Sequence, residues 1–290
     1  MRVVVEGRRG LRFDDGTPVR AASAVVPHAG GLLVAQDDAV AAAHVLPGSV
    51  RRLPVFPPVG GHEVFDAATG TKALKPDVEA AVALGPDRAL LLGSGSSPAR
   101  TRAALVGPGG PVVRDLPDLY DAVGAALGLP PGTRNLEGAC LVGDRLRWFQ
   151  RGAAALASAS VDVELAALVA AVRDGGPVPV GAVRRYDLGA VDGVALGVTD
   201  AVALPDGRVL VSAAAEDTAD PVDDGPVVAS ALVLLDGDVV VARAALPGAP
   251  KVEGLALRSS DASGAAVVAV VDDDDPGTAS ALLELRVALP

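Results

Sequence analysis

Four carboxylic residues and one serine recur along the chain, each directly ahead of a short apolar run. They are Ser23, Glu79, Glu137, Asp200 and Glu253, roughly 53 to 63 residues apart, and we call them the lead residues. Carboxylates gathered in one narrow space repel one another unless a cation binds, their pKa values rise or basic side chains neutralise them. If the fold brings the lead residues together, one of these arrangements must compensate their charge.

A divalent cation is the first of these arrangements. An oxygen-rich ligand set without cysteine and with few histidines favours Ca²⁺ or Mg²⁺ over zinc or copper, and the chain has one cysteine and three histidines. The candidate metal ligands are Glu79, Glu137, Asp200 and Glu253. The cofactor prediction is therefore Ca²⁺, with Mg²⁺ as the alternative.

Basic side chains offer a second explanation for the same carboxylates. All three lysines of the chain lie close in sequence to a lead residue, because Lys72 and Lys75 precede Glu79 and Lys251 precedes Glu253. Ion pairs with these lysines would fill the shared space without a metal. A metal-free anion site is the third interpretation, and the sequence leaves all three open.

A serine-rich loop adds candidates for binding an anionic substrate. The run Ser94 to Ser97, followed by Arg100 and Arg102, offers backbone N–H groups, hydroxyls and a guanidinium that suit phosphate or carboxylate. An ordinary exposed turn can have the same composition. The candidate substrate-binding residues are Lys72, Lys75, Ser94, Ser96, Arg100, Arg151 and Lys251. Among the histidines His62 is a candidate base, and no catalytic residue is assigned.

The lead residues introduce five similar segments, and each segment predicts a β-hairpin. Two runs rich in Val, Leu and Ala are joined by a tight turn such as Gly-Gly, Gly-Asp or Pro-Asp-Gly. The segments begin at Ala22, Val78, Leu136, Thr199 and Val252. After most hairpins come two further strand-like runs. Four strands per repeat is the pattern of a β-propeller blade.

The two ends of the chain complete the predicted ring. The last repeat supplies three strands, and the run Arg2 to Glu6 ahead of the first repeat supplies the fourth, which covers the sheet edges. The prediction is therefore one all-β domain over residues 1–290, a β-propeller of five four-stranded blades. Six blades are the alternative.

Two segments interrupt the β pattern with helical periodicity. Leu116 to Leu127 and Asp162 to Arg173 each place apolar residues on one face, which predicts two short inserted helices. Asp115 and Asp162 are the expected N-caps, and Gly128 and Gly175 lie near the expected ends.

Hairpin geometry predicts where the polar residues meet. A lead residue begins the innermost strand of its blade, and the polar residues after the second strand lie at the same end because the two strands are antiparallel. All five lead residues should therefore converge at one mouth of the central channel. The residues expected beside them are Asp37, Asp38, Ser94 to Ser97, Arg151, Glu216, Asp217 and Asp272 to Asp275.

Composition excludes several classes of partner. The chain has 290 residues, a net charge of −11 and only 2% aromatic residues, so nucleic acids and anionic membranes are not expected partners. Its one cysteine, Cys140, excludes an internal disulfide, and no stretch is typical of a signal peptide or a membrane span. We expect a cytoplasmic protein that binds a small anionic molecule. The oligomeric state is left open.

Several segments resemble those of known propellers. NLEGACLVGDRLRWFQRG and KVEGLAL are similar to inner-strand motifs of phytase-like and esterase-like β-propellers and, more distantly, of gluconolactonase-type propellers. As a whole the chain resembles an uncharacterised bacterial propeller family. The gluconolactonase resemblance implies one calcium ion at the channel mouth, held by carboxylate and amide ligands and acting as a Lewis acid. This chain departs from that pattern because its ring is nearly all carboxylate and Asn135 is its only asparagine.

Two functional hypotheses follow. The first is a divalent-cation-dependent hydrolase of a small anionic ester, lactone or phosphoester, in which Lys72, Lys75 or Arg100 orients the substrate. The second is a propeller without enzymatic activity that binds a small ligand or a protein, with its acidic ring ion-paired to Lys and Arg. Propellers host both kinds of function, so the fold cannot decide between them.

Overall fold

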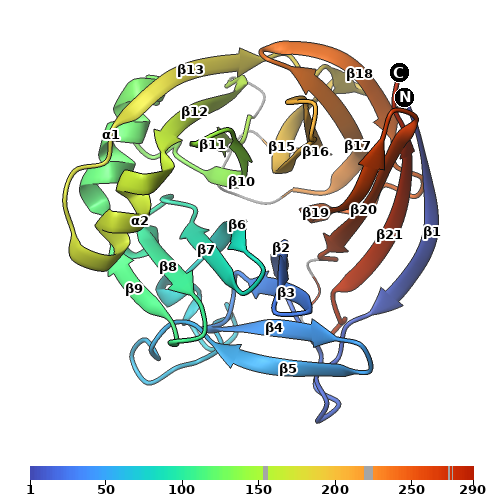
Figure 1. Cartoon of the computed structure of the whole chain (residues 1–290). Helices are drawn as coiled ribbons and strands as arrows, with labels where there is room; N and C mark the ends of the chain where they lie inside the picture. The colour runs from blue at the N-terminus through green and yellow to red at the C-terminus, as the bar shows by residue number, and fades with distance from the viewer. Residues whose placement is uncertain (153–155, 219–224, 274, 276) are drawn as a thin grey trace.

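Five antiparallel sheets surround a central channel as the blades of a propeller (Figure 1). The computed structural model describes residues 1–152, 156–218, 225–273, 275 and 277–290. The inner strands contact one another around the ring in the order β2, β6, β10, β15, β19 and back to β2. The five-bladed all-β prediction is thereby confirmed.

The blades follow one another along the chain. The first contains β2 (Ala22–His28), β3 (Gly31–Gln36), β4 (Ala41–Leu46) and β5 (Ser49–Pro54). The second contains β6 (Val78–Gly85), β7 (Arg88–Gly93), β8 (Arg102–Val106) and β9 (Val112–Asp115). The third contains β10 (Leu136–Val142), β11 (Arg145–Gln150), β12 (Ser158–Glu164) and β13 (Val180–Tyr186).

The last two blades differ slightly from this plan. In the fourth, the two-residue strand β14 (Ala190–Val191) precedes β15 (Val194–Ala203), β16 (Val209–Glu216), β17 (Val227–Asp236) and β18 (Val239–Ala245). The fifth contains β19 (Val252–Asp261), β20 (Gly264–Val271), β21 (Ala281–Ala288) and β1 (Arg2–Gly10). Each of the five predicted hairpins is an inner strand paired with the second strand of its blade.

The N-terminal strand closes the ring, as predicted. β1 pairs antiparallel with β21, from Arg2 opposite Ala288 to Gly10 opposite Ala281. The first and last strands of the chain therefore share one sheet, and both termini lie at the same edge of the ring (Figure 1). Closure of this kind joins the two ends of the sequence through backbone hydrogen bonds.

The hydrophobic core is divided into five clusters, and each lies between two neighbouring blades. Val, Leu and Ala fill these clusters, which explains how a chain with few aromatic residues forms a core. Trp148 and Tyr120 are the largest fully buried side chains and meet edge to face in the cluster between the second and third blades. Burial of apolar side chains between blades holds the ring together.

The two inserted helices are present, but their predicted N-caps are wrong. α1 spans Pro117–Leu127 and α2 spans Leu165–Asp174, with Leu116 and Glu164 at the N-cap positions and no side-chain cap at either. Asp115 is instead the last residue of β9 and pairs with Arg102. Asp162 lies inside β12, where Arg147 and Arg184 hold its carboxylate.

The ends of the helices follow the prediction. Gly128 and Gly175 are the C-cap residues, and Gly128 has the left-handed φ of +68° that glycine adopts without strain. α1 buries Leu119, Tyr120 and Val123 in the cluster between the second and third blades. Among the described residues, neither helix is long and apolar enough to cross a membrane.

Candidate functional site

Every inner strand carries a β-bulge near its start, and four of the five lead residues occupy it. The pairing with the second strand skips Ser23 in β2, Glu79 in β6, Glu137 with Gly138 in β10, and Glu253 in β19. A bulge leaves the extra residue out of the ladder and re-aims its side chain. These four side chains line one pocket, which we call the mouth pocket.

The fourth blade departs from the prediction by one residue. Its bulge falls at Thr199, whose hydroxyl donates to the carbonyl oxygen of Val252 at 2.5 Å. Asp200 stays in the ladder and does not line the mouth pocket. Its Oδ2 accepts a hydrogen bond from the backbone N–H of Leu255 on the neighbouring strand β19 at 2.6 Å. The expected convergence of all five lead residues is therefore wrong for Asp200.

The mouth pocket is small and nearly balanced in charge. Its volume is about 70 Å³, whereas pockets for drug-sized ligands measure roughly 300–1,000 Å³. Its acidic lining residues are Asp37, Asp77, Glu79, Glu137, Glu253 and Asp272, and its basic ones are Lys72, Lys75, Arg100, Arg151 and Lys251. A space of this size suits an ion or a small charged group.

Three carboxylates from the first two blades form one half of the site, and we call Asp37, Asp77 and Glu79 the acidic triad. One oxygen from each lies within 4.8 Å of the others. The Lys75 ammonium contacts Asp37 and lies 2.6 Å from Asp77 Oδ1. Arg100 Nη1 lies 3.1 Å from Asp77 Oδ2. Within the described part of the chain, Glu79 makes no hydrogen bond or ion pair through its side chain.

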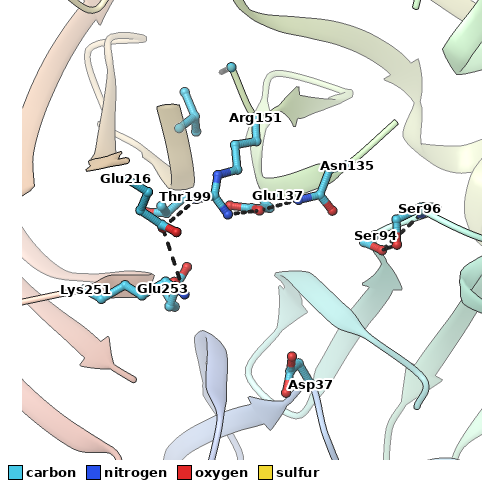
Figure 2. A network of polar contacts seen from close by, with 12 residues as sticks. Asp37, Ser94, Ser96, Asn135, Glu137, Arg151, Thr199, Glu216, Lys251 and Glu253 are labelled. Atoms are coloured by element: carbon cyan, nitrogen blue, oxygen red, sulfur yellow. Dashed lines mark hydrogen bonds and ion pairs between the residues drawn. The ribbon is translucent and has the colours of Figure 1, made fainter. Parts of the chain in front are cut away.

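The serine-rich loop forms hydrogen bonds with one member of the acidic triad, Asp77, and with its partner Arg100. Ser94 donates a short hydrogen bond to Asp77 Oδ2, and Ser96 accepts a hydrogen bond from Arg100 Nη1 at 2.8 Å. Figure 2 shows Ser94 and Ser96 side by side on the blade next to Asp37. These groups therefore hold Asp77 in place, because their hydrogen bonds are directed at that carboxylate and at each other.

A second group of charges lies across the channel and is centred on Arg151; we call Glu137, Arg151, Glu216, Lys251 and Glu253 the Arg151 cluster. Arg151 bridges Glu137 Oε1 at 3.1 Å and Glu216 Oε1 at 2.5 Å (Figure 2). Lys251 Nζ lies 3.3 Å from Glu253 Oε1 and 3.9 Å from Glu216 Oε1. The predicted pairing of lysines with lead carboxylates is thus present for Lys251 and Glu253.

Two buried oxygens at the mouth pocket have no hydrogen-bond partner among the described residues. They are Ser23 Oγ and Glu137 Oε2, and both residues are at least nine-tenths buried. Glu137 Oε1, in contrast, accepts from the Asn135 amide at 2.7 Å. Buried polar atoms are ordinarily paired with protein, water or a ligand, so the pocket presents acceptors that can hold a guest.

Burial raises the pKa of the carboxyl groups around the pocket. Asp37 reaches about 6 and Glu137 a pKa of about 7, in both cases because burial disfavours the charge more than the neighbouring cation favours it. The pKa values of Glu79 and Glu253 lie well above their ordinary range for the same reason. For Lys75, burial opposes the charge, but Asp37 and Asp77 outweigh it and raise the pKa.

The structure brings together most of the residues predicted to lie at the mouth. Lys75, Arg100, Arg151 and Lys251 all line the pocket and all contact carboxylates, whereas Lys72 is exposed at its rim. His62 is exposed and lies outside the lining. Asp38 pairs with Arg20. Asp272 lines the pocket, and Asp274 lies outside the described residues.

Asp77 is a central residue of the site that the sequence pattern did not single out. Its signal was present, because Asp77 lies two positions before Glu79 and two after Lys75. An alternating Lys-x-Asp-x-Glu run ahead of an inner strand puts opposite charges within reach of one another. Asp77 also has a left-handed φ of +55°, a conformation in which Asp is enriched among non-glycine residues.

The ring of five blades, closed by the N-terminal strand around a charged mouth pocket, defines a β-propeller. The chain belongs to the family of unknown function DUF6910, whose model matches residues 71–276. A search of curated proteins found no match.

Solved structures similar to this chain match it at very low sequence identity. A luciferin-regenerating enzyme matches with a TM-score of 0.51 and 9% identity, over 98% of this chain and 96% of that chain. A protein of unknown function from Dyadobacter fermentans matches with a TM-score of 0.45 and 12% identity, over 98% and 99% of the two chains. The N-terminal domain of Nup159 matches with a TM-score of 0.39 and 9% identity, over 99% and 95%. The likeness to the luciferin-regenerating enzyme shows the fold alone, and the resemblance to phytase-like, esterase-like and gluconolactonase-type propellers stays a prediction.

Proposed function

We propose that the mouth pocket binds a divalent cation, Ca²⁺ or Mg²⁺, at the acidic triad and that the protein hydrolyses a small anionic ester, lactone or phosphoester there. The observation that carries this proposal is the approach of three carboxylate oxygens, from Asp37, Asp77 and Glu79, to within 4.8 Å of one another. Ligand oxygens about 2.3–2.6 Å from one Ca²⁺ ion can be at most about 5 Å apart. The spacing therefore fits a shared cation.

The donor chemistry of the pocket also supports a hard cation. All the groups of the triad are carboxylates, and the unpartnered Ser23 Oγ adds a neutral oxygen to the same lining. Oxygen ligands of this kind suit Ca²⁺ and Mg²⁺. The proposal retains Glu79 from the sequence prediction and assigns the other ligand positions to Asp37 and Asp77, since one oxygen of each lies within 4.8 Å of the others and of a Glu79 oxygen.

Lys75 is the residue that must move for the triad to accept a cation. Its ammonium contacts Asp37 and Asp77, so it neutralises the same oxygens that a cation would take. Once released, the Lys75 ammonium would remain inside the pocket, and Lys72 lies exposed at the rim. We infer that these two lysines orient the anionic group of the substrate. Polarisation of the scissile oxygen and of a water molecule is the chemistry that a bound cation supplies.

A second candidate function is favoured by the ion pairs themselves. Lys75, Arg100, Arg151 and Lys251 each contact a carboxylate of the mouth, and a charge-paired pocket is stable without a guest. In that case the propeller binds a partner elsewhere on its surface and has no hydrolytic site. The response to divalent cations separates the two functions.

The deciding experiment is a calorimetric titration of Ca²⁺, Mg²⁺ and Mn²⁺ into protein stripped with EDTA, together with thermal melts. If the triad binds one ion, a concentration of about one hundred times its Kd should add roughly 2.7 kcal/mol to the free energy of unfolding. Glu79→Gln should weaken binding at least tenfold. Glu253→Gln, a matched change on the far side of the pocket, should leave binding within about threefold.

Hydrolysis is then measured on small lactones, aryl esters and phosphoesters with the preferred ion present. Turnover that requires the ion and is lost in Glu79→Gln supports the full proposal. Ion binding without turnover of any member of the panel leaves a cation-binding propeller and contradicts hydrolysis. No stabilisation by any ion would establish the charge-paired pocket as the correct account.

A further inference from the structure

A second cavity lies further along the same channel, toward the end opposite the mouth pocket. Each inner strand contributes three consecutive residues to its wall, and we call this cavity the apolar chamber. Its lining is Val25–Pro27, Ala81–Ala83, Ala139–Leu141, Ala201–Ala203 and Leu255–Leu257. With a rise of about 3.3 Å per residue, these positions lie roughly 7 to 13 Å beyond the bulges.

The chamber differs from the mouth pocket in chemistry and in size. None of its lining residues is charged, and its volume is about 240 Å³, compared with about 70 Å³ at the mouth. Asp200 lines neither cavity and occupies the position on β15 between them. Burial raises the pKa of Cys140 to about 12, so its thiol is a neutral part of the apolar wall.

Small side chains keep the chamber open. Alanine occupies at least one of the lining positions in β6, β10, β15 and β19, and the other lining residues are Val, Leu, Pro and Cys. The mouth-side half of each lining segment is buried, and Leu141, Val202 and Leu257 are half-buried near the opening. The result is a cup whose wall combines apolar side chains with the backbone edges of the inner strands, and whose rim faces solvent.

We propose that the apolar chamber is a binding site for a small uncharged apolar molecule, such as a monocyclic ring or a short alkyl chain. Apolar cavities of about 150 Å³ bind benzene, and this one is larger. A charged ligand would lose its hydration without finding a charged side chain in the wall. A protein partner needs about 800 Å² of contact surface, far more than the inside of this cup offers. The proposal does not depend on the cation site.

The test is a benzene titration of the full-length protein, followed by NMR of the methyl groups. Saturable shifts confined to chamber residues such as Val26, Leu141, Val202 and Leu257 are expected, and EDTA should not change them. Shifts that fail to saturate, or that spread evenly over the interblade clusters, would overturn the proposal. So would a concentration-dependent dimer, seen by sedimentation, that benzene dissociates, because the chamber would then be an interface between copies.

Variants sharpen this test. Val202→Asp places a charge in the wall and should weaken benzene binding at least tenfold. Val239→Asp makes the same change on β18, where Val239 is 60% exposed, and should leave binding unchanged. Ala203→Leu fills the chamber without adding charge and serves if Val202→Asp does not fold; it too should weaken binding at least tenfold. Equal affinity in wild type and a folded Val202→Asp or Ala203→Leu protein would show that benzene binds elsewhere.

Discussion

Asp200 shows how strongly a single residue's register decides its chemistry. The bulge at Thr199 puts Asp200 back into the ladder, where it bridges to Leu255 of the next blade instead of facing the mouth. Gly138 on the neighbouring strand β10 allows Asp200 to come this close, because a Cβ at position 138 would lie 2.5 Å from Asp200 Cα. The φ of Gly138 is +72°, which also favours glycine. Burial raises the pKa of Asp200 well above its ordinary value, so a neutral side chain is favoured at this position.

Asp200 therefore has a structural role that an amide can fulfil. In Asp200→Asn the side-chain oxygen can still accept from the Leu255 N–H, and we expect a loss of less than about 1 kcal/mol in the free energy of unfolding. Asp200→Ala removes the acceptor and leaves a buried N–H unpaired, which should cost about 1–3 kcal/mol. Urea unfolding measures both values. A loss of ion affinity in Asp200→Asn would instead make Asp200 a metal ligand, as the sequence alone predicts.

At the level of elements, the closure of the ring depends on β1. Along this strand Val3 is 9% exposed and belongs to the cluster between the fourth and fifth blades, whereas its neighbour Val4 is 42% exposed. β1 covers the edge of β21, which would otherwise be the unpaired outer edge of the last blade. The strand is thus held by backbone pairing along its length and by alternate side chains on one face only.

This alternation provides a matched pair of variants in adjacent positions. Val3→Asp buries a carboxylate among apolar side chains and should lower the free energy of unfolding by about 3 kcal/mol. Val4→Asp should change it by less than about 1 kcal/mol. Chemical denaturation of the two variants beside the wild type gives the comparison. Equal losses would mean that β1 is held by its backbone alone, and no loss in Val3→Asp would mean that the ring does not need this strand's core contact.

Most of the elements could be predicted because their signals are periodic and local. Five apolar hairpins with tight turns, and a missing strand in the last repeat, lead directly to five closed blades. The N-caps could not be predicted in this way, because Asp115 and Asp162 have arginine partners on neighbouring strands that only the tertiary structure brings near. The position of the bulge at Thr199 has no local signal either. Thr199 and Asp200 are adjacent, and the sequence does not show which of the two the pairing with the second strand leaves out.

On the scale of the whole molecule, opposite charges contributed by all five blades hold the mouth together. The acidic triad joins the first and second blades, and the Arg151 cluster joins the third, fourth and fifth. Burial raises the pKa values of Asp37 and Glu137, and the neighbouring Lys75 and Arg151 offset only part of that rise. The site could be predicted as an acidic ring near lysines, but its division into two clusters depends on which blades are neighbours.

The titration of these carboxyl groups gives a prediction for the stability of the whole ring. Asp37 and Glu137 have pKa values of about 6 and about 7 in the folded protein, above their ordinary values of 3.8 and 4.5. Between about pH 4 and pH 7 the folded state therefore binds more protons than the unfolded state, and the free energy of unfolding falls as pH rises. His28 acts in the opposite direction, because burial lowers its pKa.

We expect the melting temperature in EDTA to fall between pH 5 and pH 8, with the free energy of unfolding lower at pH 8 by on the order of 1–3 kcal/mol. Glu137→Gln cannot ionise at this position and should show a flatter profile, whereas His28→Gln should show a steeper one. A divalent cation favours the charged carboxylates, so its stabilising effect should grow over the same range. A wild-type profile that is flat or rises with pH in EDTA, and that Glu137→Gln leaves unchanged, would mean that the mouth carboxylates are already charged below pH 5. The ion pairs with Lys75 and Arg151 would then dominate over burial, and the mouth would be a fixed charge lattice at every pH of interest.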